Sequence, residues 1–255
     1  MDIFSWNVNG IRACAKKGFK EFIDEYSPDV LFLQETKVAE SDLPDELCNP
    51  YGYQSVWHSA ERKGYSGVAV LTRLTPTNVI SGFGNPEFDC EGRVIQIEFN
   101  DLLILGVYFP NGQKDDTRLN YKLRFYNALF DYCDEMRSMG KKLIVCGDYN
   151  TAHTPMDLAR PKENQHTSGF LPIEREWISE LCRRGYVDIY RKQHPNNESY
   201  SWGSYRSAAR EKNIGWRIDY FMVGDDVQDQ VTESFILNQV MGSDHCPVGI
   251  RLNGS

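Results

Sequence analysis

Short apolar runs rich in β-branched and aromatic residues recur along the whole chain, and they constrain the fold more than any other feature of the sequence. We recognise about eleven of them, with the length and composition of β-strands. They cover residues 3–8, 30–34, 54–58, 68–72, 94–99, 102–109, 143–147, 200–204, 218–223, 234–237 and 246–252. So many strands exceed what a simple doubly wound sheet contains, and the sequence therefore predicts more than one sheet.

Three stretches carry the three-and-four residue spacing of an amphipathic helix. The longest covers residues 117–139, with Thr117 as its expected N-cap. A second covers residues 172–184, with a proline in its first turn, acidic residues near its start and Gly185 beyond its end. A third is expected over residues 17–26. Strands interleaved with few helices indicate an α/β fold in which two sheets pack together with helices outside.

We expect a single domain over residues 1–255, because there is no low-complexity segment, short-period repeat or long linker. The longest apolar run covers residues 102–109, far short of the roughly 20 residues of a membrane helix. The start of the chain does not resemble a secretory signal. The seven scattered cysteines are typical of reduced thiols. These features predict a cytoplasmic protein without a membrane partner.

The net charge of −8 is concentrated in one segment and does not exclude nucleic acid as a partner. Residues 21–46 contain nine acidic residues and one lysine, a net of −8, so the remainder of the chain sums to zero. Residues 204–217 carry four basic residues and one acidic residue, a net of +3. Phosphate contacts depend on such local patches, although a solvated surface is the commoner role of a charged stretch.

Polar residues gather where the predicted strands begin or end. The residues concerned are Asn7, Gln34, Glu35, Tyr108, Asp148, Asn150, Asp219, Asp244 and His245. Strand ends feed the loops in which α/β proteins place their chemistry. We therefore expect these side chains to assemble into one polar cluster.

The composition of this cluster indicates a reaction class. Carboxylates together with amides are hard oxygen ligands, which suit Mg²⁺ or Mn²⁺ and not zinc. An aspartate beside a histidine orients the imidazole and stabilises its protonated form. The sequence has no P-loop, no dinucleotide-binding glycine motif and no nucleophile elbow. Metal-assisted attack of water on a phosphate ester is the reaction that fits.

Each of these residues also has an ordinary structural role open to it. Asn7 and Asn150 can cap turns after strands. Glu35 and Asp148 can begin a loop or cap a helix, and a single histidine such as His245 is more often structural than catalytic. Their joint occurrence at strand ends is what favours a catalytic site.

Seven motifs together carry a resemblance to a known family. They are SWNVNG at 5–10, LQETK at 33–37, GYSGV at 64–68, YFPN at 108–111, GDYN at 147–150, GWRIDY at 215–220 and GSDHCP at 242–247. Over nearly the whole chain the sequence resembles the exonuclease III family of apurinic/apyrimidinic (AP) endonucleases, within the endonuclease/exonuclease/phosphatase superfamily. The resemblance implies an α/β fold, a four-layer sandwich of two packed mixed β-sheets flanked by helices.

The resemblance also implies a metal site in the polar cluster. Glu35 would bind Mg²⁺, for which Mn²⁺ would substitute. Asn7, Asp244, Asp148 and Asn150 would be further ligands or close neighbours of the metal.

The same resemblance implies catalytic roles. Asp148 would align or deprotonate the attacking water, and Asn150 would hold that water and the phosphate. His245, oriented by Asp219, would stabilise charge on the phosphoryl group. Tyr108 would hydrogen-bond the phosphate or the leaving group.

The implied substrate is double-stranded DNA with abasic sites or blocked 3′ ends. Cleavage 5′ to the abasic site would leave a 3′-hydroxyl and a 5′-deoxyribose phosphate. The same centre would act as a 3′→5′ exonuclease and as a 3′-phosphatase and phosphodiesterase, and some relatives also cut beside uracil or other damaged nucleotides. We expect the enzyme to be a monomer.

Substrate recognition is expected from loop residues that match those of the family. Trp202, Trp216 and Ile218 would form an apolar pocket for a flipped-out abasic deoxyribose, although core packing is the ordinary role of a residue such as Trp202. DNA contacts are expected from Arg12, Lys63, Tyr65, Asn111, Lys114, Asn164 and Arg206.

Two positions depart from the family pattern. Asn9 stands where some relatives have aspartate, which changes the surroundings of the metal. Thr167 stands where some relatives have an asparagine that reaches the phosphate, so this contact is expected to be weaker or to come from Asn164.

Two other functions fit parts of the sequence. The first is a phosphoinositide or sphingolipid phosphoesterase of the same superfamily, which Trp202, Trp216 and the basic stretch 204–217 disfavour. The second is a non-catalytic DNA-binding or scaffold module. A module of that kind is expected to have lost a site residue, whereas Glu35, Asp148, Asn150, Asp219 and His245 are all present.

Overall fold

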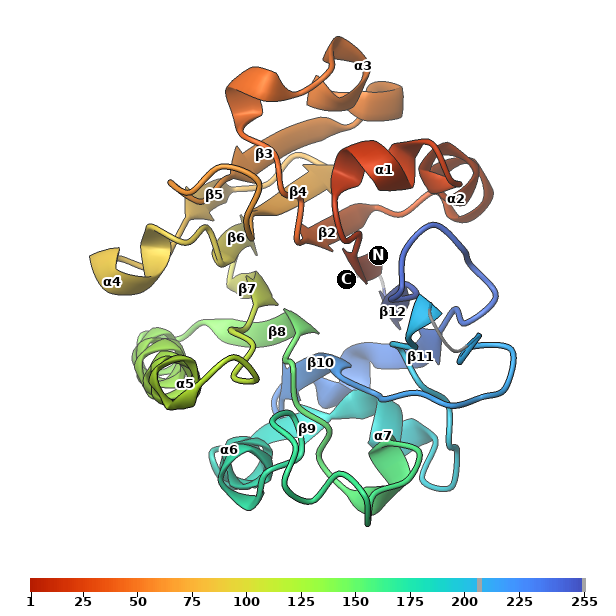
Figure 1. The fold of residues 1–255 in the computed structure, drawn as a ribbon. Coiled ribbons are helices and arrows are strands. Elements are labelled where there is room, and N and C mark those ends of the chain that lie inside the picture. The colour runs from red at the N-terminus through yellow and green to blue at the C-terminus, as the bar shows by residue number, and fades with distance from the viewer. Residues whose placement is uncertain (206–207, 254–255) are drawn as a thin grey trace.

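Two six-stranded sheets form the centre of the molecule (Figure 1). The structure is a computed structural model and describes residues 1–205 and 208–253. The first sheet contains β1 (Asp2–Asn7), β2 (Val30–Gln34), β3 (Gln54–His58), β4 (Val68–Thr72), β11 (Val231–Ile236) and β12 (Val248–Leu252), in the order β11-β12-β1-β2-β4-β3. The second contains β5 (Asn78–Ser81), β6 (Val94–Phe99), β7 (Leu102–Tyr108), β8 (Lys142–Asp148), β9 (Tyr186–Asp188) and β10 (Asp219–Gly224), in the order β5-β6-β7-β8-β10-β9.

Both sheets are mixed, and in each the described strands include one parallel pair among antiparallel neighbours. The parallel pairs are β1 with β2 and β7 with β8. Parallel neighbours need a long crossover. Helices supply much of that connection in both sheets.

Most of the helices lie on the outer faces of the two sheets (Figure 1), whereas α7 packs against β10 of one sheet and β11 of the other, with Ile189 in the apolar cluster between the sheets. They are α1 (Ile11–Ala15), α2 (Phe19–Tyr26), α3 (Asp45–Cys48), α4 (Pro86–Asp89), α5 (Asp116–Ser138), α6 (Pro172–Arg183) and α7 (Ile189–Gln193). Between residues 1 and 253, leaving aside 206–207, none of the helices combines the length and apolar character needed to cross a membrane.

The alternation of side chains along the central strands explains the layered structure. Phe32 of β2 packs between the sheets in one apolar cluster with Ile104 of β7. Its neighbour Leu31 points the other way, into a cluster with Phe22 of α2, as does Leu105 into a cluster with α5. Strands buried on both faces appear in the sequence as nearly continuous apolar runs. The predicted four-layer sandwich is confirmed.

Several local predictions were wrong. Residues 200–204 do not form a strand, because Trp202 makes only isolated bridges to Trp216 and His245. The N-cap of α5 is Asp115, whose side chain accepts the Arg118 N–H, and not Thr117, which lies within the helix. The short strands β5 and β9 were missed because each offers too few apolar residues to give a period.

The register of the strands brings their polar ends to one edge of the sandwich. Asn7 at the end of β1 pairs with Gln34 at the end of β2. In the second sheet Asp148 pairs with Tyr108 on one side and with Asp219 on the other. The polar residues that follow the apolar runs therefore share one site.

Candidate active site

Two carboxylates and one imidazole form the centre of the site. One ligand atom from each of Glu35, Asp148 and His245 lies within 4.8 Å of the others. Asp148 and His245 are buried, whereas Glu35 is partly exposed toward the pocket. Oxygen donors at this spacing can hold a divalent cation, and carboxylates suit a hard ion.

Asn7 bridges the two carboxylates through its amide nitrogen. The Nδ2 atom donates to Glu35 Oε1 at 2.8 Å and to Asp148 Oδ2 at 2.9 Å. Its Oδ1 atom accepts the backbone N–H of Asn9 at 3.0 Å. Asn7 thus orients both expected metal ligands, and its own side-chain oxygen already accepts a hydrogen bond.

Asn150 donates two hydrogen bonds that hold it next to Asp148. Its backbone N–H donates to Asp148 Oδ1 at 2.8 Å, and its Nδ2 donates to the carbonyl of Phe109 at 2.8 Å. The backbone adopts a left-handed conformation with φ of 50°, which asparagine tolerates better than most residues. Within residues 1–205 and 208–253, the remaining side-chain oxygen has no hydrogen-bond partner, and Asn150 lines the pocket.

Asp219 holds the His245 ring from the side opposite to Asp148. The Nδ1 atom of His245 lies 2.8 Å from Asp219 Oδ2, and Nε2 lies 3.7 Å from Asp148 Oδ2. Burial lowers the pKa of the imidazolium, but the carboxylates of Asp219 and Asp148 outweigh burial and raise the pKa well above its ordinary value. The ring is therefore a buried cation between two carboxylates.

Burial raises the pKa of the Asp148 carboxyl, and the nearby carboxylates of Asp219 and Glu35 raise it further. The cationic His245 opposes this shift. Burial also raises the pKa of Tyr108 well above that of a free phenol. Tyr108 therefore keeps its proton at neutral pH and can act as a hydrogen-bond donor.

A pocket of about 460 Å³ opens above these groups. It is lined by Asn9, Glu35, Tyr108, Asn111, Gln113, Asn150, Asn164, Thr167, Ser168, Gly169, Trp202, Trp216, Ile218, Asp244 and His245. Its lining includes the carboxylates of Glu35 and Asp244 and the apolar side chains of Trp202, Trp216 and Ile218. Most of the residues expected to contact metal or substrate therefore face a single cavity.

Trp202, Trp216 and Ile218 form the apolar part of this lining. The two backbones pair through reciprocal hydrogen bonds of 2.9 Å, and the two indole rings meet edge to face with centroids 6.4 Å apart. Trp202 Nε1 also donates to Asp244 Oδ2 at 3.1 Å. Both indoles are only partly buried and both line the pocket, so they form its wall as well as packing on the small apolar cluster that contains Phe170.

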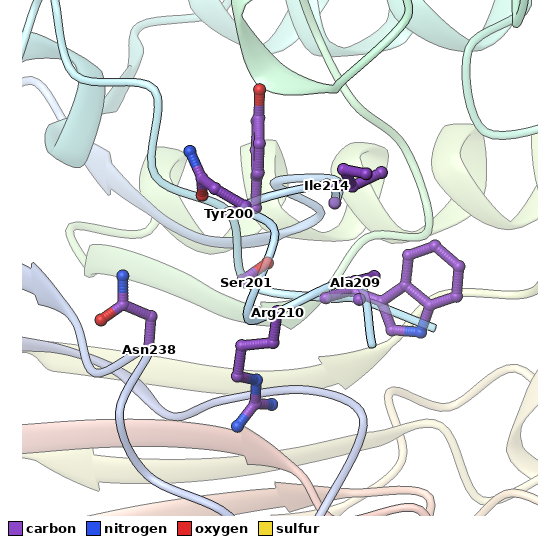
Figure 2. Close-up of a pocket in the computed structure, with 10 residues that line it drawn as sticks. Tyr200, Ser201, Ala209, Arg210, Ile214 and Asn238 are labelled. Carbon is purple, nitrogen blue, oxygen red and sulfur yellow. The ribbon is translucent and has the colours of Figure 1, made fainter. Parts of the chain in front are cut away.

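A second cavity, of about 220 Å³, lies beside Trp202 (Figure 2). Most of its lining comes from residues 200–205 and 208–218, which we call the tryptophan segment. Arg210 and Asn238 line this cavity, and Trp202 lines both the cavity and the pocket. The guanidinium of Arg210 donates to the carbonyls of Val240 at 2.6 Å and Ser243 at 3.0 Å. It thereby links the tryptophan segment to the residues that precede Asp244.

A buried ionic network fixes the other side of the tryptophan segment. Arg217, which lies between two pocket residues, makes a bidentate pair with Asp188 at 3.0 and 2.6 Å and bonds Asp157 at 2.8 Å. Breaking such a buried pair is costly because it leaves a charge without a partner. The pocket wall is therefore anchored in the core.

The residues expected to contact DNA are less uniform in their placement. Asn111 and Asn164 line the pocket. Arg12, Lys63 and Lys114 are exposed and lie outside it. Arg206 lies outside the described residues.

Tyr65, which was also expected to contact DNA, has its hydroxyl held within the protein. It accepts from Arg93 at 2.8 Å and from Arg118 at 2.9 Å. Arg93 also lies over the Tyr108 ring at 5.0 Å from its centroid. Tyr65 is therefore connected to the wall of the pocket.

The structure adds pocket residues that sequence reasoning did not select. Gln113, Ser168 and Gly169 line the pocket, and Lys37 lies 3.4 Å from Glu35 Oε2 and hydrogen-bonds Asn9 Oδ1 at 2.6 Å. Lys37 belongs to a motif already recognised, and its proximity to Glu35 in the sequence was the available signal. Gln113 and Ser168 are in loops whose composition carries no comparable signal, whereas Gly169 begins a GFLP stretch (169–172) that also resembles the DNA-repair members of the family.

Comparison with known proteins decides the family. Residues 4–245 match the Endonuclease/Exonuclease/phosphatase family. The chain belongs to the endonuclease/exonuclease/phosphatase family.

Relatives of this family share the full length of the chain. An exodeoxyribonuclease of Bacillus subtilis (strain 168) is 42% identical over 99% of this chain and 100% of its own. A DNA-(apurinic or apyrimidinic site) endonuclease of Dictyostelium discoideum is 41% identical over 98% of this chain and 70% of its own. The solved structure of a Neisseria 3′ phosphatase bound to a product DNA hairpin superposes with a TM-score of 0.91 at 27% identity, covering 100% of both chains.

We predict that His245 stays protonated well above the ordinary histidine pKa of about 6.5 in metal-free protein. The stabilisation from its ion pairs is complete below about pH 6.5 and is lost as pH rises through the raised folded pKa. In Asp219→Asn the pKa should fall, because one flanking carboxylate is gone. NMR titration of the histidine ring in EDTA measures both values, and a wild-type ring that titrates near pH 6.5 would contradict the prediction.

Proposed function

We propose that the protein is a Mg²⁺-dependent DNA-repair phosphodiesterase that hydrolyses the DNA backbone 5′ to abasic sites. The 3′→5′ exonuclease, 3′-phosphatase and 3′-phosphodiesterase activities, and incision beside uracil or other damaged nucleotides, would use the same centre. One observation carries the proposal: Glu35 and His245 of the carboxylate–imidazole cluster line the same pocket as Trp202 and Trp216. The functions named for the relatives agree with it.

The donor set fits a hard divalent cation. We assign Glu35 and Asp148 as the residues that would hold it, with Asp244 and Asn150 close by and Asn7 orienting both carboxylates. Mg²⁺, or Mn²⁺ in its place, would supply Lewis-acid polarisation of the phosphoryl group.

The protein groups divide the remaining chemistry among them. Asp148 is placed to orient the attacking water and accept its proton, because its pKa is raised by burial. His245 remains cationic and would stabilise the negative charge that develops on the phosphoryl oxygens. Asn150 would accept a hydrogen bond from the attacking water through its available side-chain oxygen, and it would hold the phosphate through that water. Tyr108 would donate a hydrogen bond from its hydroxyl to a phosphate oxygen.

The apolar side chains of the pocket explain selectivity for a nucleotide without a base. Extruding a nucleotide from the duplex costs a few kcal/mol, and the cost is lowest where no base is stacked or paired. Trp202, Trp216 and Ile218 offer a surface for the sugar face of the extruded residue. Arg217, which lies between Trp216 and Ile218 in the chain, anchors this wall to Asp188 in the core.

The DNA backbone would be held by the residues around the pocket. We assign this role to Asn111 and Asn164 within it and to Arg12, Lys63, Tyr65, Lys114 and Arg206 outside it. Contacts of this kind release counterions, so binding should weaken steeply as salt rises. We further propose that residues 1–255 act as one domain and as a monomer inside the cell.

Cleavage of a defined duplex tests the proposed function. We predict that a labelled duplex with one tetrahydrofuran abasic analogue is cut 5′ to the analogue in Mg²⁺, not in EDTA, and before an undamaged duplex is degraded. The analogue cannot undergo β-elimination, so a cut demonstrates hydrolysis. Turnover of phosphoinositides without any cut in Mg²⁺ or Mn²⁺ would refute the DNA substrate, and inactivity on both would favour a non-catalytic module.

The pocket assignment predicts that Trp216→Ala and Asp148→Asn separate recognition from chemistry. Trp216→Ala should reduce the preference for abasic over undamaged duplex on the order of tenfold or more, because it removes one wall of the pocket. Asp148→Asn should leave binding nearly intact and lower kcat by roughly 10²- to 10⁴-fold. Fluorescence-anisotropy binding and single-turnover cleavage measure the two effects. An unchanged preference in Trp216→Ala would mean that this indole serves the core alone.

A further inference from the structure

Lys122 of α5 and Glu174 of α6 form an ion pair that has no contact with solvent. Both side chains are 0% exposed, and Lys122 Nζ lies 2.8 Å from Glu174 Oε1. A buried pair is expensive to desolvate and is weak evidence for stability by itself. What the two charges bond to besides each other therefore becomes the informative observation.

Lys122 bonds directly to the loop after β8, residues 149–152, which we call the catalytic loop. Its ammonium group donates to the backbone carbonyl of Asn150 at 2.7 Å. Asn150 is the residue with left-handed backbone and with its N–H and Nδ2 committed to Asp148 and Phe109. The bond from Lys122 is therefore the third hydrogen bond that fixes Asn150. With three bonds the loop cannot rotate freely, so the direction of the Asn150 side-chain oxygen is fixed.

Glu174 bonds to a second loop of the pocket rim, residues 168–171, which lies beside the loop of Asn150. Its Oε2 accepts the backbone N–H groups of Gly169 at 2.6 Å and Leu171 at 3.2 Å, and its Oε1 accepts the Ser168 hydroxyl at 2.8 Å. Ser168 and Gly169 both line the pocket. Four donors thus converge on one carboxylate, counting Lys122.

Gly169 connects this rim to the tryptophan wall. Its φ is 101°, and a Cβ atom there would lie 2.9 Å from the Trp216 ring. Its carbonyl accepts the N–H of Ala152 at 2.8 Å, which joins the rim to the catalytic loop a second time. A small displacement of Gly169 would therefore move both Trp216 and the loop of Asn150.

We propose that Lys122 and Glu174 are positioning residues that set the distance between the phosphate-binding Asn150 and the Gly169–Trp216 wall. Neither residue lines the pocket. Each acts through the backbone of the loop that it holds, and the ion pair joins the two loops. The inference rests on the proposed function for the choice of substrate, but not for the geometry.

Three variants test the role of the pair. Lys122→Met with Glu174→Gln removes both charges and leaves no unpaired buried ion, so the double variant should fold. Lys122→Arg keeps the charge and a donor for the Asn150 carbonyl. Arg137→Met is the matched control, because Arg137 of the same helix also makes an ion pair, with Asp225 at 2.8 Å, and a carbonyl bond, to Arg184 at 2.8 Å, far from the pocket.

The readouts are steady-state kcat and KM on the abasic duplex, and hydrogen exchange of the backbone amides at 149–152 and 168–171. We expect the double variant to lose at least tenfold in kcat with less than a threefold change in KM, and to exchange faster in both segments. Lys122→Arg should recover most of the loss. Arg137→Met should lose stability in urea and keep its kcat.

The outcomes separate this inference from the proposed function. A folded double variant with wild-type kcat and wild-type exchange in both segments would overturn the inference. An equal loss of kcat in Arg137→Met would also overturn it, because the effect would then be general destabilisation. If the wild type fails to cut abasic DNA, the proposed function fails, and hydrogen exchange in the two segments still decides whether the pair holds both loops.

Discussion

The Asp148 carboxylate is almost fully buried where the two sheets meet, and the rest of the structure depends on how it is stabilised there. Asp148 ends β8, and its two oxygens receive the Asn7 amide and the Asn150 backbone N–H, with the His245 cation close by. A buried carboxylate is tolerated only when its charge is matched and its lone pairs are satisfied. Each partner comes from a different part of the chain, so satisfying Asp148 brings the first strand, the loop after β8 and the C-terminal segment together.

The need to match buried charges also explains why ion pairs and charged hydrogen bonds surround the pocket. The cation of His245 is itself held by Asp219, and the tryptophan wall is held by Arg217 and Arg210. The Lys122–Glu174 pair holds the rim between them. Charged groups that never touch substrate therefore determine the shape of the surface that does, and preorganised geometry of this kind costs no rearrangement during the reaction.

Much of this site could be predicted from the sequence because its residues follow buried strands directly. Glu35, Tyr108 and Asp148 adjoin apolar runs, and strand register then places them together. The prediction of a strand over 200–204 is wrong because the aromatic residues of this stretch imitate a strand, whereas Trp202 serves as pocket wall. Lys122 and Glu174 could not be found from the pattern, since they lie 52 residues apart in ordinary helical contexts and only the packing of α5 against α6 pairs them.

The central claim is that the strand ends of both sheets build one site for a divalent cation and a phosphate. Anomalous diffraction from crystals soaked with Mn²⁺ and inorganic phosphate tests it most directly. We predict a manganese peak beside Glu35 and Asp148, and a phosphate between His245 and Asn150 with the tryptophan wall beyond it. Manganese bound only elsewhere, or phosphate bound away from His245 in crystals with this pocket accessible, would contradict the account.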